Sequence, residues 1–214
     1  MISPRFLLLP GWQDSGPTHW QSRWQQAAGF HRVQQDDWWW PRRGDWMSRL
    51  EDELLADPRP AVLVAHGLGC HLVAVWAGHS QHTARVHAAL LVAPPDLLRA
   101  DTPPQLHNWL PIGNRALPFA STAVLSADDA FCSLARGRDI ARGWGSQVVM
   151  MAAAGHILGG SGLGHSGLGH SGLDDWPAGR ALLQALVQRA GLAPIGACPG
   201  PGEPSAAAPC TGVP

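Results

Sequence analysis

Lysine and tyrosine are absent from this sequence, and charged residues make up only 14% of its 214 residues. All 15 basic residues are therefore arginine, and the formal net charge at pH 7 is −1. A nearly neutral chain has no electrostatic surplus to attract a polyanion, so neither nucleic acid nor a membrane surface is expected as a partner. No apolar run reaches the roughly 18 residues of a membrane helix. The N-terminus also lacks the basic start and long apolar region of a signal peptide. These absences predict a soluble, cytoplasmic protein.

Metal-ligand spacing is also absent. The cysteines follow no zinc pattern, and two of them fall in a Pro- and Gly-rich tail, which argues against a disulfide framework; they are Cys70, Cys132, Cys198 and Cys210. His165 and His170 could join His156 as metal ligands, but their Gly-rich spacing and the lack of a carboxylate or Cys at a fixed offset make this the weaker alternative. We expect no metal and no cofactor.

Apolar runs of strand length alternate with amphipathic segments along the chain. The runs are largely continuous in hydrophobicity, as in strands that are covered on both faces. The strands are expected at 5–10, 61–66, 87–94, 121–126 and 146–153, and the helices at 17–28, 45–56, 68–79, 133–144 and 178–190. This alternation predicts an α/β fold in three layers, with a parallel sheet between helices, as in the α/β-hydrolases.

Cap residues support three of these helices. Asp45 and Ser133 are expected as N-caps, and Pro177 suits the first turn of the last helix. The polar segment 31–35 is a candidate for an additional edge strand.

The expected domain covers residues 1–190. Within it, residues 161–175 repeat the unit SGLGH twice and begin a third copy, which we interpret as an expanded Gly-rich surface loop. Residues 191–214 are rich in Pro, Gly and Ala and are expected to be a disordered tail.

The stretch AVLVAHGLGCH at 61–71 reads as a buried strand, a turn of small residues and the start of a helix. Such turns present a nucleophile between small residues at a positive φ. Here the apex residue is Gly67, which has no side-chain oxygen. The N–H of Leu68 would face a developing oxyanion, and the N–H of Trp12 or Gln13, in the loop after the first strand, is the candidate for a second donor.

Two further polar positions follow strands. An acidic pair, Asp128 and Asp129, comes after strand 121–126, and His156 comes after strand 146–153. The order apex, acid, histidine is that of the α/β-hydrolases, and residues after parallel strands meet at one sheet edge. Taken singly, the acids could cap a helix and His156 could be an ordinary loop histidine.

The chain resembles the retinoblastoma-binding-protein-like serine hydrolases, a compact branch of the α/β-hydrolases. The resemblance spans roughly residues 5–190. Its most specific stretches are LPGWQDSGPTHWQSRW (9–24), LPFASTAVLSADDAFCS (117–133) and AAGHI (153–157). It implies an esterase-like activity on small acyl substrates, with Gly67 at the serine position, Asp129 as the triad acid and His156 as the triad base. Asp129 is preferred to Asp128 because the family's acid precedes a Pro-aromatic pair, here Ala130-Phe131.

Three function classes follow. The first is a hydrolase impaired at its nucleophile, acting on a small ester or amide-like molecule. The second is a pseudoenzyme that binds a small ligand or a protein partner through the retained pocket, in which Trp38 is a candidate lining residue. The third is an intact hydrolase whose serine is replaced in this copy only. Cys70, three residues after the apex, is the alternative nucleophile, although it fits better as a small apolar residue packed beneath the turn.

Overall fold

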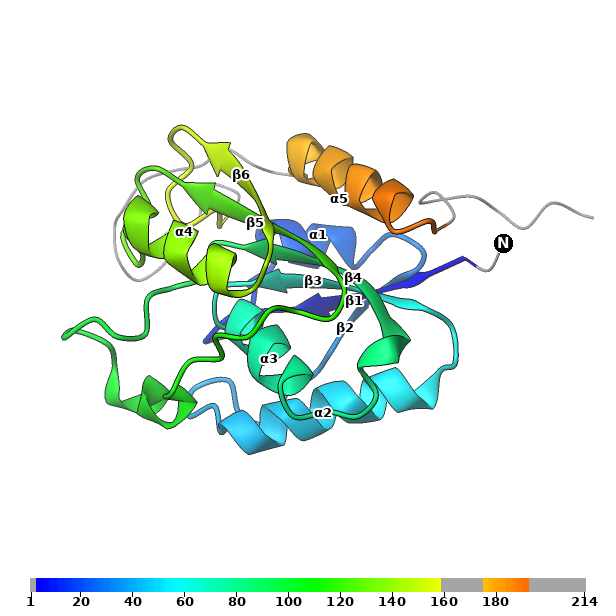
Figure 1. The fold of residues 1–214 in the computed structure, drawn as a ribbon, viewed down its shortest axis with the longest axis horizontal. Helices are drawn as coiled ribbons and strands as arrows, with labels where there is room; N and C mark the ends of the chain where they lie inside the picture. Colours follow the sequence, from blue (N-terminus) through cyan, green and yellow to red (C-terminus); the bar gives the residue numbers. More distant parts are fainter. Residues whose placement is uncertain (1–2, 159–174, 193–214) are drawn as a thin grey trace, which may run out of the picture.

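The computed structural model describes residues 3–158 and 175–192. These residues form a six-stranded parallel sheet in the order β2-β1-β3-β4-β5-β6 (Figure 1). The strands are β1 (Arg5–Leu9), β2 (Phe30–Arg32), β3 (Ala61–His66), β4 (Val86–Val92), β5 (Ala120–Ser126) and β6 (Gln147–Met151). The helices are α1 (Trp20–Trp24), α2 (Arg43–Ala56), α3 (Leu68–Ala77), α4 (Leu134–Gly143) and α5 (Pro177–Arg189), with 3₁₀ turns η1 (Thr83–Arg85) and η2 (Pro104–Trp109).

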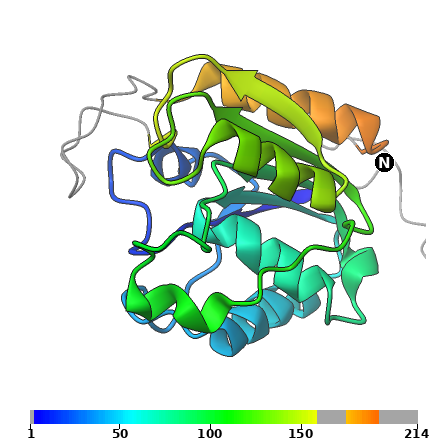
Figure 2. The same cartoon turned by 60° about the vertical axis from the view of Figure 1, so that its left-hand side comes forward.

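Helices cover both faces of the sheet. On one face, side chains of α2, α3 and α4 pack against alternate strand residues such as Leu7 and Leu63. On the other, tryptophans of α1 and leucines of α5 pack against Leu8 and Val64. Figures 1 and 2 show α5 and α2 on opposite sides of the sheet. The predicted three-layer α/β architecture is confirmed.

All five predicted strands are present, with ends within two residues of the predicted ones. The edge strand expected at 31–35 is shorter and shifted, at Phe30–Arg32. The prediction that the strands are covered on both faces was wrong for β6, where Val148 and Met150 are each 37% exposed. Both side chains pair with Ala123 and Leu125 of β5 and so lie on the face that α4 covers, and β6 is the last strand at that edge of the sheet.

The helix expected at 17–28 was also wrong, because α1 has only five residues. After Trp24 the backbone makes two tight turns, in which the N–H groups of Gln26 and Ala27 bond three residues back. Gly29, at φ 86°, then directs the chain into β2. Both tryptophans of α1, one helical turn apart, are still fully buried.

Two of the three predicted cap residues are confirmed. Ser133 caps α4 by accepting from the N–H of Arg136, and Pro177 opens α5, as predicted. The prediction of Asp45 as an N-cap was wrong, since α2 begins at Arg43 and Asp45 lies in its first turn. The first N–H of α2 is instead bonded by the Asn108 side chain, 3.0 Å away, which removes the need for a local cap.

The predicted loop at 161–175 and tail at 191–214 fall almost wholly outside the described residues, so the domain boundaries stay predictions. Within the described residues, no helix combines the length and the apolar character needed to cross a bilayer.

Candidate active site

The turn between β3 and α3 is built around Gly67. Its backbone lies at φ 54° and ψ −123°, a conformation that residues with a Cβ rarely adopt. The Gly67 N–H donates to the carbonyl of Val92 (3.0 Å), which ties the turn to the end of β4. Close packing explains the next glycine, since a Cβ on Gly69 would lie 2.3 Å from the carbonyl oxygen of Leu9. The turn therefore has the sharp strand-to-helix geometry that exposes a nucleophile.

Asp129 and His156 lie together beside this turn. The Nδ1 of His156 is 2.9 Å and 3.1 Å from the two carboxylate oxygens of Asp129, and the Asp129 side chain is only 4% exposed. Because a carboxylate accepts, Nδ1 carries the hydrogen, and in the neutral ring Nε2 is a free acceptor. A Cβ built on Gly67 would lie 3.5 Å from that Nε2. The structure thus brings together the three positions that the chain order placed at one sheet edge.

The two adjacent acids have different contacts. Asp129 bonds to His156, whereas one oxygen of Asp128 accepts from the backbone N–H groups of Ala154 and Gly155. Neither acid caps α4. The division between the two acids agrees with the preference for Asp129 that the resemblance implied.

His66 is a contact of this site that the sequence analysis missed. Its Nε2 lies 2.9 Å from the carbonyl oxygen of His156, and since a carbonyl only accepts, His66 is the donor. Burial lowers the pKa of His66 well below its ordinary value, with further contributions from His19 and His156. His66 is therefore a neutral ring that holds the backbone of His156. In the sequence, the only indication that His66 belongs to the site was its position next to Gly67.

The N–H groups expected to face an oxyanion are only partly available. Leu68 is the first residue of α3, and Gly11 packs so closely that a Cβ there would lie 3.4 Å from the Leu68 nitrogen. The N–H of Gln13 donates to the carbonyl of Trp38 (3.0 Å), so Gln13 is engaged and is not the second donor. Trp12 remains the candidate in this loop.

Cys70 and Trp38 are both occupied in packing. Cys70 is fully buried, its Sγ lies 3.3 Å from the carbonyl of Val92, and burial raises the pKa of its thiol. A buried thiol of this kind is not a nucleophile, so packing beneath the turn is confirmed. The ring of Trp38 lies edge-on to Trp46 at 5.3 Å.

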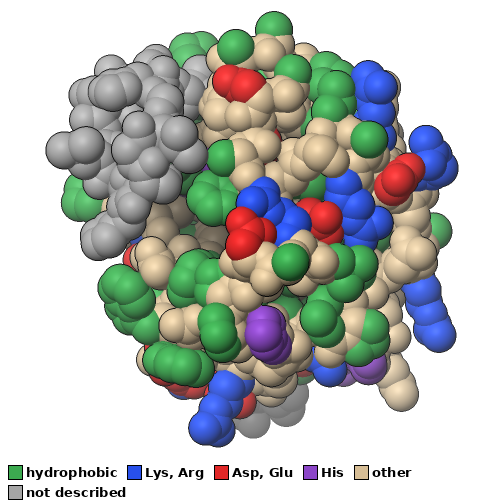
Figure 3. Space-filling model, turned by 90° about the vertical axis from the view of Figure 1, so that its left-hand side faces the viewer, with side chains coloured by type: hydrophobic (Ala, Val, Ile, Leu, Met, Phe, Trp, Pro, Cys, Tyr) green, Lys and Arg blue, Asp and Glu red, His purple; other side chains and the backbone are tan. Residues whose placement is uncertain are grey.

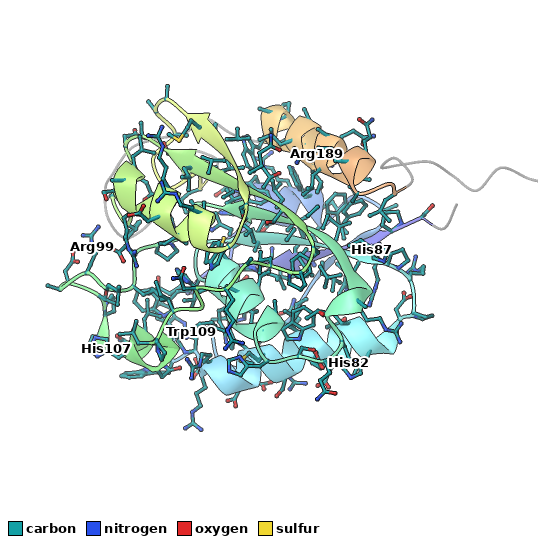
Figure 4. The ribbon with its side chains drawn as sticks, viewed as in Figure 1. His82, His87, Arg99, His107, Trp109 and Arg189 are labelled. Carbon is teal, nitrogen blue, oxygen red and sulfur yellow. The ribbon has the colours of Figure 1, made fainter. Side chains whose placement is uncertain are left out.

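The edge where the strands end is rimmed by apolar side chains. Figure 3 looks onto this edge, where hydrophobic side chains are prominent. Within residues 3–158 and 175–192, eight large hydrophobic residues are exposed, and five of them belong to loops after strands: Trp39, Trp40, Leu98, Phe131 and Leu158. The ring of Phe131 contacts His156, with centroids 4.7 Å apart. In Figure 4, Arg99 and His107 lie toward the same edge, and His82 and His87 lie at the opposite end of the sheet.

A surface depression of about 620 Å³ lies near this rim and is lined by Trp40, Arg42, Arg43, Gly44 and Asn108. Neither Gly67 nor His156 lines it. Its presence therefore adds nothing to the chemistry at the end of β3.

A parallel sheet with a sharp turn after β3 and an acid–histidine pair beside it defines the α/β-hydrolase class. The family model described as serine hydrolase matches residues 6–185, and the chain belongs to this family. No curated protein matches the chain.

Several solved structures share the fold. A YdeN-like hydrolase from Pectobacterium atrosepticum has a TM-score of 0.71 and 24% identity, over 88% of this chain and 92% of that one. The ydeN gene product of Bacillus subtilis has a TM-score of 0.56 and 19% identity, over 73% and 89%. Esterase 2 of Thermogutta terrifontis, in a form phosphonylated by cyclosarin, has a TM-score of 0.57 and 19% identity, over 90% and 86%. At these identities the likeness establishes the α/β-hydrolase fold alone.

Proposed function

We propose that this protein is a carboxylesterase-like serine hydrolase whose nucleophile position is taken by Gly67, so that cleavage of small acyl esters is impaired or lost. The observation that carries the proposal is the distance of 3.5 Å between a Cβ built at position 67 and Nε2 of His156. A hydroxyl at position 67 would lie beside a general base that Asp129 already orients.

The chemistry follows from these positions. With a serine at 67, Nε2 of His156 would take the hydroxyl proton as Oγ attacks the ester carbonyl, and Asp129 would stabilise the resulting imidazolium. The N–H groups of Leu68 and Trp12 are the proposed donors to the oxyanion. Glycine offers no oxygen, so the covalent acyl intermediate cannot form at 67. The apolar rim supports an uncharged, apolar acyl substrate.

The test restores the hydroxyl. Gly67→Ser should hydrolyse short p-nitrophenyl esters at least roughly 10³-fold faster than Gly67→Ala, which has the same backbone strain without the oxygen. The Ser variant should also be labelled by a fluorophosphonate probe at residue 67. Adding His156→Ala or Asp129→Asn should remove most of the turnover. A folded Gly67→Ser that neither turns over esters nor takes the label contradicts the proposal, and so does strong labelling of the unaltered chain at any other residue.

A second candidate is a pseudoenzyme that binds a small ligand or a protein partner. It is favoured by the bonded Asp129–His156 pair, which persists beside a position without a nucleophile. Titrating the unaltered chain with short esters and carboxylates, while following the NMR signals of His156 and the Leu68 amide, tests it. Saturable shifts that disappear in His156→Ala support binding. Linear shifts that the variant retains argue against it.

A further inference from the structure

His156 sits in a tight turn, Ala154 to Ile157. The N–H of Ile157 donates to the carbonyl of Ala154 (2.9 Å), which closes the turn. Gly155 has φ 53° and Ile157 has φ 54°, so two residues flanking the histidine are in a region that most side chains avoid. Such a turn needs external contacts to hold one conformation.

One carboxylate oxygen supplies two of these contacts and also accepts from a residue of β5. Oδ1 of Asp128 accepts from the N–H of Ala154 (3.0 Å), the N–H of Gly155 (2.9 Å) and the hydroxyl of Ser126 (2.6 Å). The hydroxyl oxygen of Ser126 also accepts from the Ala154 N–H (2.9 Å). The first two residues of the turn are thus bonded to the end of β5.

The remaining contacts come from other elements. The carbonyl of His156 accepts from His66, at the end of β3. The carbonyl of Ile157 accepts from the indole N–H of Trp20 on α1, at 2.9 Å. Of the described groups that bond to the backbone of the turn (Ser126, Asp128, His66 and Trp20), only Asp128 carries a formal negative charge. Hydrogen bonds to an ionised acceptor are roughly twice as strong as neutral ones. The hydroxyl of Ser126 and the N–H of Gly155 both lower the pKa of Asp128, which keeps it ionised at neutral pH.

We propose that Asp128 is a positioning residue. Its carboxylate holds the turn Ala154 to Ile157 so that the His156 ring reaches from Asp129 to position 67. It acts on the base through the backbone and does not touch the ring. The structural part of this inference is independent of the proposed function, whereas its effect on turnover rests on it.

The structural part is tested in the unaltered chain. Asp128→Ala should raise the amide hydrogen exchange rate of Gly155 at least ten-fold and broaden or shift the ring signals of His156. Asp128→Asn keeps a carbonyl oxygen at the same place and should retain most of the protection. Asp139, which bonds to Arg142 on the surface of α4, offers a matched control, and Asp139→Ala should leave both signals unchanged. Unchanged exchange at Gly155 in Asp128→Ala overturns the proposal.

The catalytic part is tested in the Gly67→Ser background. There Asp128→Ala should lower kcat roughly ten-fold with KM unchanged, because a misplaced base weakens the transition state and leaves substrate binding intact. Asp128→Asn should stay within about three-fold of the parent, since its carbonyl oxygen can still accept from the turn. If the Asn variant is as slow as the Ala variant while its Gly155 amide still exchanges at the parent's rate, Asp128 acts on His156 through its charge and the positioning role is wrong. If Gly67→Ser itself is inert, the proposed function fails, and the exchange rates still decide the role of Asp128.

Discussion

Replacing Gly67 by alanine separates backbone strain from steric clash at the turn after β3. The position has φ 54° and ψ −123°, where an added Cβ strains the backbone. Space is not limiting, because that Cβ would lie 3.5 Å from the Cα of Gly11 and 3.5 Å from Nε2 of His156, both ordinary contacts. The whole cost of the substitution should therefore be conformational.

The expected loss of unfolding free energy is about 1–3 kcal/mol, the usual cost of a residue held in a sparsely populated conformation. With a urea dependence of roughly 2 kcal/mol per molar, the midpoint should fall by about 0.5–1.5 M with an unchanged slope. Gly44→Ala is the control, because this helical position has no neighbour within 4 Å of an added Cβ and no positive φ. It should be neutral or stabilising by up to about 1 kcal/mol.

Two results would refute this reasoning. A midpoint for Gly67→Ala equal to that of Gly44→Ala would mean that the turn is not strained in solution. A loss above roughly 5 kcal/mol, close to the whole stability of a small domain, would mean that the space beside His156 is not open.

Three other perturbations test the packing around the site. Gly69→Ala should cost more than about 3 kcal/mol in a urea titration, because its Cβ would lie 2.3 Å from the backbone oxygen of Leu9; a loss equal to that of Gly67→Ala would contradict the close approach. Burial lowers the pKa of His71 to about 4, so the unfolded chain binds the extra proton between pH 6.5 and 4 and stability falls as the pH drops through this window. Between pH 7 and 4.5, the free energy of unfolding of His71→Gln should therefore fall by roughly 2 kcal/mol less than that of the parent. Parallel plots of unfolding free energy against pH for the two proteins would rule this out. Trp20→Phe removes the hydrogen bond to Ile157 and should cost about 1–2 kcal/mol while raising exchange at the amides around His156; unaltered exchange would show that this bond does not hold the turn.

The strands were the most predictable part of the fold. β3 was placed to the residue because its apolar run is bounded on both sides by turn residues, and burial on both faces leaves little freedom in such a segment. α1 was not predictable, because buried tryptophans one helical turn apart suit a long helix as well as a single turn. The helix ends early because the chain has to turn into β2, and that turn is set by the tertiary structure and not by the local sequence. The same holds for Asp45, since the group that caps α2 is Asn108, distant in sequence.

The juxtaposition at the candidate site was predictable from chain order, because residues that follow parallel strands meet at one edge. The partners of individual groups were not. Residue types alone did not assign Asp128 to the backbone and Asp129 to the imidazole, since either acid could make either contact. Nor did they show that the N–H of Gln13 bonds to Trp38, because that contact depends on how two loops pack.

The contacts that hold His156 do not pass through residue 67. Its ring is bonded to Asp129 and covered by Phe131, and its carbonyl is bonded to His66. The turn that carries it is bonded to Asp128, which follows β5. Exchanging serine for glycine at 67 would remove the nucleophile and relieve backbone strain without disturbing any of these bonds. Under the proposed function, the general base would therefore remain in place in a chain without its nucleophile, and a serine introduced at 67 would meet a histidine that is already oriented.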